Sequence, residues 1–396
     1  MSSKLKPATI AVRAAIESDE QHGAVVPPLH LSTNFTYAAY GEQRQYDYTR
    51  SGNPTRDALA DALTSLEGGA NAVVTSSGMA AITLVLQLLE PGDLLLAPHD
   101  CYGGTYRLLD RLAGKRHFKL VWVDQNDEVA LSKAIALNPR LIIVETPSNP
   151  LLRIVDIERM SKLAEHCNAL LAVDNTFLSP LLQQPIALGA DIVIHSTTKY
   201  LNGHSDVVGG AVIAASNELA EELRFWANCL GLTGAPFDSY LTLRGLRTLH
   251  ARMRQHEENA LQLAAMLDEH PAVRQVYYPG LGSHPGHEIA CRQQRGFGGM
   301  LSFELAGGEA AMRTFLESLK HFSLAESLGG VESLVCHPAT MTHAPMSEQA
   351  MAEAGISQNL IRLSIGIENG EDLVTDVLNA LNATANKVKP VAGAVS

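Results

Sequence analysis

The chain has no excess of positive charge. Its 396 residues include 30 Lys and Arg against 42 Asp and Glu, which gives a formal net charge of −12 at pH 7. Because nucleic acids and anionic membranes bind basic surfaces, neither is expected as a partner. Cysteine is also scarce, with five residues and no C-x-x-C spacing, which argues against a disulfide framework or a zinc cluster and predicts no metal.

The sequence also lacks a long apolar run. The stretch ITLVLQLL from Ile82 is interrupted by polar residues and is far shorter than the ~20 apolar residues of a membrane span. The N-terminal sequence MSSKLKPATIAVRAA has neither the apolar core of a secretory signal nor a basic amphipathic transit pattern. These features predict a cytoplasmic protein that does not enter a membrane.

What is present is apolar content sufficient for large cores. Hydrophobic residues make up 46% of a chain that is longer than one domain usually is, so two domains are expected. Residues 1–60 are polar and Pro-rich and predict an irregular arm that contacts a neighbouring subunit. Residues 61–256 would form the main domain, and residues 257–396 a smaller C-terminal α/β domain.

Short apolar runs alternate with helical patterns between residues 63 and 215. Helices such as 128–136 and 157–167 separate strands expected at 71–75, 93–98, 119–124, 140–145, 170–174, 191–196 and 211–215. Strands that are apolar throughout and joined by helices indicate a mainly parallel seven-stranded sheet covered on both faces. Beyond it we expect helices around 241–259, 259–269, 308–319 and 371–383, and strands at 273–277, 300–304 and 360–365.

Lys199 follows the strand that ends near His195, in the string HSTTKY. An amine at the carboxyl end of a parallel strand lies where α/β sheets bind ligands, and it can form a Schiff base if its pKa is lowered. Ser196 and Thr198 offer two hydroxyl groups suited to a phosphate. On spacing alone, an ordinary surface lysine on a turn is the more common case.

Two other strand ends carry candidate residues. Asp174 ends the strand 170–174, where a buried acid needs a cationic ring nitrogen or a metal as partner. Gly78, in SSGMAA, opens a helix after strand 71–75, and backbone N–H groups at a helix start bind phosphate. A capping aspartate and a simple capped helix start explain these two signals as well.

Tyr102 and Asn149 follow two further strands. Tyr102 could stack on a planar ring and Asn149 could hydrogen-bond a ring hydroxyl, although both also fit ordinary turns. Taken together, the strand ends of one sheet provide an amine, an acid, a phosphate cradle, an aromatic ring and an amide. This combination is what a planar phosphorylated cofactor requires.

The same segments resemble the Cys/Met-metabolism family of pyridoxal-phosphate enzymes. The resemblance runs from about residue 8 to 380 and is carried by YDYTRSGNPTRD, SSGMAA, ETPSNP, VDNTF, HSTTKYLNGHSDVVGG and LIRLSIGIE. It implies a fold type I PLP-dependent transferase, pyridoxal 5′-phosphate (PLP) as cofactor, and a homotetramer built as a dimer of dimers with shared active sites.

The resemblance also assigns roles around the cofactor. Lys199 would carry PLP as an imine and move protons between carbons, Asp174 would pair with the pyridinium nitrogen, and Tyr102 would stack on the ring. The phosphate would be held from within the subunit by Gly78, Met79, Ser196 and Thr198, and from the neighbouring subunit by Tyr48 and Arg50.

Around the substrate, the resemblance implies that Arg362 grips the α-carboxylate and that Asn149 contacts the ring hydroxyl or the substrate, with Ser327 beside them. Glu326 would hold a distal amine, and Arg107 the distal carboxylate of a succinyl group. A strand-end salt bridge for Arg362, a loop salt bridge for Glu326 and a surface position for Arg107 are the structural alternatives.

The sequence around Tyr102 and Glu326 favours one reaction of this family. L-Cysteine would replace the succinyl group of O-succinyl-L-homoserine, giving L-cystathionine and succinate. The alternative is γ-elimination of cystathionine to cysteine, 2-oxobutyrate and ammonia, which stays open because Ser51 stands where bacterial family members of the first kind carry a basic residue. A non-catalytic scaffold is opposed by the intact Lys199, Asp174 and Arg362.

Overall fold

The seven strands expected between residues 63 and 215 form one sheet in the computed structural model, which describes residues 5–388. In spatial order the strands are β1 (Asn71–Thr75), β7 (Gly210–Ala214), β6 (Ile192–His195), β5 (Leu170–Asp174), β4 (Leu141–Glu145), β2 (Leu94–Pro98) and β3 (Lys119–Val123). Strand β7 pairs antiparallel with β1 and β6, and the other neighbours pair in parallel. The prediction of a mainly parallel seven-stranded sheet is confirmed.

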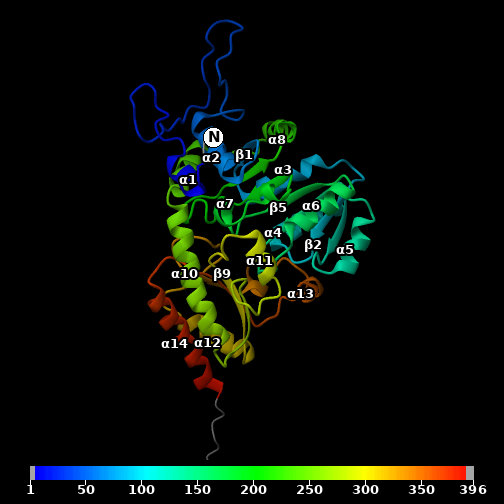
Figure 1. Cartoon of the computed structure of the whole chain (residues 1–396), viewed down its shortest axis with the longest axis vertical. Helices are drawn as coiled ribbons and strands as arrows, with labels where there is room; N and C mark the ends of the chain where they lie inside the picture. Colours follow the sequence, from blue (N-terminus) through cyan, green and yellow to red (C-terminus); the bar gives the residue numbers. More distant parts are fainter. Residues whose placement is uncertain (1–4, 389–396) are drawn as a thin grey trace, which may run out of the picture.

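Helices cover both faces of this sheet (Figure 1). On β5, Ala172 packs with one core cluster and Val173 with another, as the alternation of a strand requires. The first cluster includes α3 (Gly78–Val85), α4 (Gly103–Gly114) and α8 (Asn217–Leu230), and the second α5 (Glu128–Ile135) and α6 (Ile157–His166). Burial on both faces explains why these strands are apolar throughout.

A second unit contains the five-stranded sheet and lies below the first in Figure 1. Its strand order is β10 (Ser323–Leu324), β11 (Leu334–Cys336), β12 (Leu360–Ser364), β9 (Met300–Leu305) and β8 (Val273–Tyr277). Helices α12 (Gly308–Ser318) and α14 (Gly370–Val388) pack together beside it, and the unit also contains α11 (His287–Gln293) and α13 (Glu348–Ala354). The short strands β10 and β11 were not anticipated.

One helix boundary was predicted wrongly. The break expected at Asn259 does not occur, because α9 (Pro236–Leu246) ends earlier and α10 (Leu249–Asp268) continues through this position. The buried Asn259 amide donates to the carbonyl oxygens of Gly366 and Glu368, at 3.0 and 2.9 Å. These tertiary hydrogen bonds satisfy a side chain that otherwise disfavours a helix interior.

The N-terminal arm is less irregular than expected. Helix α1 (Pro7–Arg13) lies within it, and α2 (Pro54–Glu67) begins before residue 60. Ala11 of α1 is buried in a cluster with Leu59 and Leu63 of α2. Between these helices the chain forms long loops that stand away from the body (Figure 1). Among residues 5–388, no helix combines the length and apolarity needed to span a bilayer.

A buried contact between a carboxyl group and an imidazole ties α2 to the central sheet. Glu67 Oε1 lies 2.6 Å from His195 Nε2 and accepts a second hydrogen bond from Asn175 Nδ2 at 2.9 Å. All three side chains are buried. Removing the acid would leave His195 Nε2 without its partner inside the core and would take away one of the two acceptors of the Asn175 amide.

Glu67→Ala is therefore expected to lower the free energy of unfolding by about 3 kcal/mol, measured by urea denaturation. The control is Glu17→Ala, which breaks an exposed ion pair with Arg13 and should change stability little. Equal effects of the two substitutions would show that the buried pair does not stabilise the fold.

Candidate active site

A cavity of about 330 Å³ opens at the carboxyl ends of the central strands. Loops following β4, β5 and β6 line one side of it, and residues of the second unit, including Arg362 of β12, line the other. The cavity brings together most of the residues expected from the sequence: Gly78, Met79, Tyr102, Asn149, Asp174, Ser196, Thr198, Lys199, Glu326, Ser327 and Arg362.

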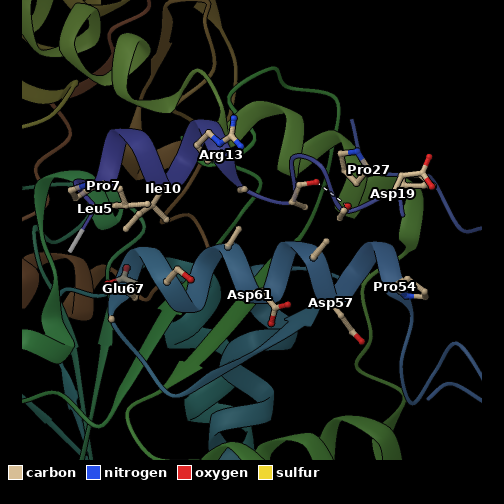
Figure 2. A pocket seen from close by; sticks show the side chains of 18 of the residues that line it. Leu5, Pro7, Ile10, Arg13, Asp19, Pro27, Pro54, Asp57, Asp61 and Glu67 are labelled. Carbon is tan, nitrogen blue, oxygen red and sulfur yellow. Dashed lines mark hydrogen bonds between the residues drawn. The ribbon is translucent and has the colours of Figure 1, made fainter. Parts of the chain in front are cut away.

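A larger hollow of about 1310 Å³ lies elsewhere, beside α1 and α2 (Figure 2). Asp57 and Asp61 lie along α2 at this hollow, and burial raises the pKa of both carboxyl groups. None of the expected site residues lines it. The smaller cavity is therefore the one with the chemistry of a cofactor site.

Lys199 follows β6 and its amine faces a loop of the second unit. Its Nζ donates a hydrogen bond to Ser327 Oγ at 2.7 Å. Burial, together with the charge of Arg362, lowers the pKa of Lys199 to about 8, and the carboxylate of Glu326 opposes this shift. An amine held in this way loses its proton more readily than a surface lysine, as a Schiff-base lysine requires.

The helix start that the sequence predicts as a phosphate site is the N-terminus of α3. Ser77 caps this helix by accepting a hydrogen bond from Ala80 N at 3.0 Å. A Cβ atom on Gly78 would lie 2.8 Å from Ser196 Cβ, so only glycine allows the helix start to approach β6 this closely. Thr198 lies beside them, and its hydroxyl exchanges hydrogen bonds with the backbone of Gly209.

Asp174 ends β5 and lines the cavity. Burial raises the pKa of its carboxyl group, while a hydrogen bond from Thr176 N at 3.0 Å and the nearby His195 partly offset this. No Lys or Arg pairs with Asp174 among the described residues. A half-buried acid without a cationic partner, in the same cavity as the start of α3 and the Lys199 amine, fits the ring nitrogen of PLP.

Tyr102 and Asn149 are joined through a residue that the sequence analysis missed. Glu145, the last residue of β4, accepts hydrogen bonds from Tyr102 N at 3.0 Å and from Asn149 N at 2.8 Å. Burial and the neighbouring Asp174 raise the pKa of Glu145 well above its usual range. The sequence feature that could have identified Glu145 is the one that identified Asp174, namely an acidic residue at the end of an apolar strand.

Arg362 is buried and fixed in orientation. Nη1 donates to Asn149 Oδ1 and Nη2 to the carbonyl oxygen of Ser327, both at 2.8 Å. Its Nε is buried and has no protein acceptor. Ser327 itself has a backbone φ of +87°, a conformation that is costly for a residue other than glycine. The arrangement leaves a guanidinium edge free to bind a carboxylate.

Three expected residues do not line the cavity. Arg107 lies exposed on α4, close enough to lower the pKa of Tyr102, which burial and Glu326 raise. Arg50 donates to the backbone and side-chain oxygens of Asn228, at 2.8 and 2.6 Å, and lies over the ring of Tyr48. Tyr48 and Arg50 are thus remote from the cavity of their own subunit.

Several cavity residues besides Glu145 were not anticipated. Thr176 links two strand ends, because its Oγ1 accepts a hydrogen bond from Ser196 N at 2.9 Å. Of the others, Thr342 is polar, and the rest are apolar and give no chemical signal in a sequence: Ile82, Pro147, Phe177, Val208 and Leu328.

Comparison with known proteins agrees with this geometry. The family model described as "Cys/Met metabolism PLP-dependent enzyme" matches residues 8–382. Cystathionine γ-synthase of Escherichia coli (strain K12) is 57% identical over 383 residues, which cover 96% of this chain and 99% of that protein. Cystathionine γ-lyase of Bacillus subtilis (strain 168) is 47% identical over 377 residues, which cover 95% of this chain and 99% of that protein.

Among solved structures, a cystathionine γ-synthase from Xanthomonas oryzae pv. oryzae in complex with cystathionine superposes with a TM-score of 0.96. It is 59% identical in sequence, and the match covers 97% of this chain and 100% of that one. The family model, the relatives and the cavity agree on the cofactor and on small amino-acid substrates. The chain belongs to the family of Cys/Met metabolism PLP-dependent enzymes.

Proposed function

We propose that the chain is a cystathionine γ-synthase, which replaces the succinyl group of O-succinyl-L-homoserine by L-cysteine and releases succinate. The observation that carries the proposal is the presence of Arg362 and Glu326 in one cavity with Lys199. The fixed guanidinium of Arg362 suits the α-carboxylate of O-succinyl-L-homoserine, and the exposed carboxylate of Glu326 suits the amine of L-cysteine. The relatives at 57% and 59% identity, both named cystathionine γ-synthase, support the same reaction.

The cofactor supplies the electronic part of the chemistry, because bound PLP draws electron density from the substrate Cα. Asp174 would hold the proton on the ring nitrogen, and Tyr102 would cover the ring and keep water away. Lys199 would carry the cofactor and then move protons at the substrate Cα and Cβ. Gly78 and Ser196, together with Met79 and Thr198, would hold the phosphate.

The substrate would be oriented by the second unit. Arg362, fixed by Asn149 and by the carbonyl of Ser327, would bind the α-carboxylate in a bidentate manner. Glu326 would hold the amine of the incoming cysteine. Arg107, exposed on α4 near Tyr102, would meet the distal carboxylate of the succinyl group.

A homotetramer made of two dimers, with active sites shared within each dimer, is part of the proposal. The arm 1–60 would lie on the neighbouring subunit and bring Tyr48 and Arg50 to its phosphate. The exposed apolar side chains of this arm and the hollow beside α1 (Figure 2) support a partner there. The free thiols of all five cysteines suit the proposed cytoplasmic location.

The test is a pair of steady-state assays on the purified, PLP-loaded protein. With O-succinyl-L-homoserine and L-cysteine we expect L-cystathionine and succinate in equal amounts, at least about tenfold faster than 2-oxobutyrate is released from cystathionine. The second candidate, γ-elimination, is favoured by Ser51 and by the B. subtilis relative. Rapid 2-oxobutyrate release without cystathionine synthesis would establish that candidate instead.

The pKa of Lys199 predicts how the apoprotein takes up its cofactor. Lys199 would take up the cofactor in its neutral form, and the fraction of neutral amine rises as the pH passes through about 8. Stopped-flow absorbance should show the rate of PLP uptake increasing roughly tenfold from pH 7 to pH 9 and then levelling off. Glu326→Gln removes an opposing charge and should move the plateau to lower pH, whereas a rate still rising at pH 10 would contradict the lowered pKa.

A further inference from the structure

We propose that Glu145 is a positioning residue of this site, whose buried carboxyl group sets both the stacking Tyr102 and the Asn149 that fixes Arg362. The inference rests on the proposed function only in taking the substrate to be an amino acid with an α-carboxylate. It holds whether the substrate then undergoes replacement or elimination.

The geometry around Glu145 is the first support. Each carboxyl oxygen accepts one backbone N–H: Oε2 that of Tyr102, at 3.0 Å, and Oε1 that of Asn149, at 2.8 Å. Tyr102 ends the segment between β2 and α4, and Asn149 lies in the segment after β4. One side chain therefore fixes two loops that enter the cavity from neighbouring strands.

The second support is what these loops hold. Asn149 Oδ1 accepts a hydrogen bond from Arg362 Nη1, and Arg362 Nη2 donates to the carbonyl of Ser327, each at 2.8 Å. Ser327 Oγ accepts a hydrogen bond from Lys199 Nζ at 2.7 Å. A continuous series of contacts thus connects Glu145 to the carboxylate-binding arginine and to the cofactor lysine.

The third support is the cost of placing an acid here. Glu145 is buried at the end of β4, directly opposite Asp174 in the register of β4 and β5. Two acids side by side in a partly dry site destabilise the fold, and no cationic side chain pairs with Glu145 among the described residues. Glutamine would fill the same volume but accept only through one oxygen, which leaves one of the two N–H groups facing an amide donor.

The experiment is a double-mutant cycle on glycine binding. Glu145→Gln, Asn149→Ala and the double variant are loaded with PLP, and the affinity for glycine is measured by isothermal titration calorimetry. If Glu145 acts through Asn149, each single change weakens glycine binding by about tenfold and the double variant is no weaker than either. The visible circular dichroism of bound PLP should also change in Glu145→Gln, because the ring of Tyr102 shifts.

Glu165→Gln, the same change on the exposed face of α6, is the matched control and should bind glycine as the unmodified protein does. The inference would be overturned if the two losses of glycine affinity multiplied in the double variant, or if Glu145→Gln bound glycine as tightly as the unmodified protein. Should Glu145→Gln fail to fold, Glu145→Asp, which keeps the carboxyl group but shortens its reach, is put through the same cycle. Glycine carries no leaving group, so failure of the proposed replacement reaction leaves this result readable.

Discussion

Lys199→Ala is expected to abolish turnover, lowering kcat by about 10⁴-fold or more. Among the described residues, Lys199 is the only lysine that lines the cavity. Its Nζ donates a hydrogen bond to Ser327 Oγ, which orients the amine toward the second unit of the fold. Without it, PLP would have no covalent anchor and the substrate Cα would have no proton acceptor. The loss should therefore appear in kcat more than in KM.

The variant must be compared at equal cofactor loading, with succinate release as the measurement. Lys162→Ala, which removes an exposed lysine of α6, is the control and should retain full activity. A small primary amine such as methylamine should restore part of the lost rate by replacing the missing base. More than about one hundredth of the original kcat in Lys199→Ala, without added amine, would exclude the proton-transfer role.

The fold of the central sheet and the location of the site follow from the sequence for the same physical reason. Strands buried on both faces are apolar throughout, so their ends are marked by the first polar residue, as at Asp174. Parallel pairing brings those ends to one edge. The location of Asp174 and Ser196 in one cavity, at the ends of the parallel strands β5 and β6, was predictable from this rule.

Contacts that depend on tertiary packing were not predictable in this way. The sequence marks Glu145 as a strand end, as it does Asp174. The two backbone N–H groups that donate to its carboxyl oxygens come from different loops, and no sequence periodicity predicts these contacts. The unbroken course of α10 through Asn259 depends on carbonyl groups more than a hundred residues away. The positive φ of Ser327 likewise has no sequence signal, since glycine is the residue usually found there.

The roles of Tyr48 and Arg50 stay predictions, for a geometric reason. Both side chains lie outside the cavity of their own subunit, with Arg50 bound to Asn228. A residue that serves a neighbouring active site makes its important contacts in the assembly. The contacts that would test these two roles therefore form only at the interface between two copies of the chain.

Asp174→Asn is expected to lower kcat by about 10³-fold while stabilising the apoprotein. Asparagine is nearly isosteric and can keep the hydrogen bond from Thr176 N, but it cannot hold a proton on the ring nitrogen. The cofactor would then draw electrons from the substrate Cα less strongly. PLP should also dissociate more readily, because a charge-assisted contact is lost.

The stability effect follows from the sign of the pKa shift. Burial raises the pKa of Asp174, so the folded apoprotein disfavours the carboxylate more than the unfolded chain does, and this penalty is present at neutral pH. Asparagine removes it. Urea denaturation at pH 7 should therefore show the Asp174→Asn apoprotein unfolding at higher urea than the unmodified one, with the difference fading toward pH 4 as both states protonate the acid.

Asp268→Asn, the same change at an exposed position on α10, is the control and should alter neither activity nor stability. An acid that only caps the turn after β5 would behave differently, because its removal would destabilise the apoprotein and leave kcat nearly unchanged. Lower activity together with higher apoprotein stability is the combination that a carboxylate kept for a cationic ligand predicts. Asp174 would then be a residue that the fold tolerates at a cost, and whose partner arrives with the cofactor.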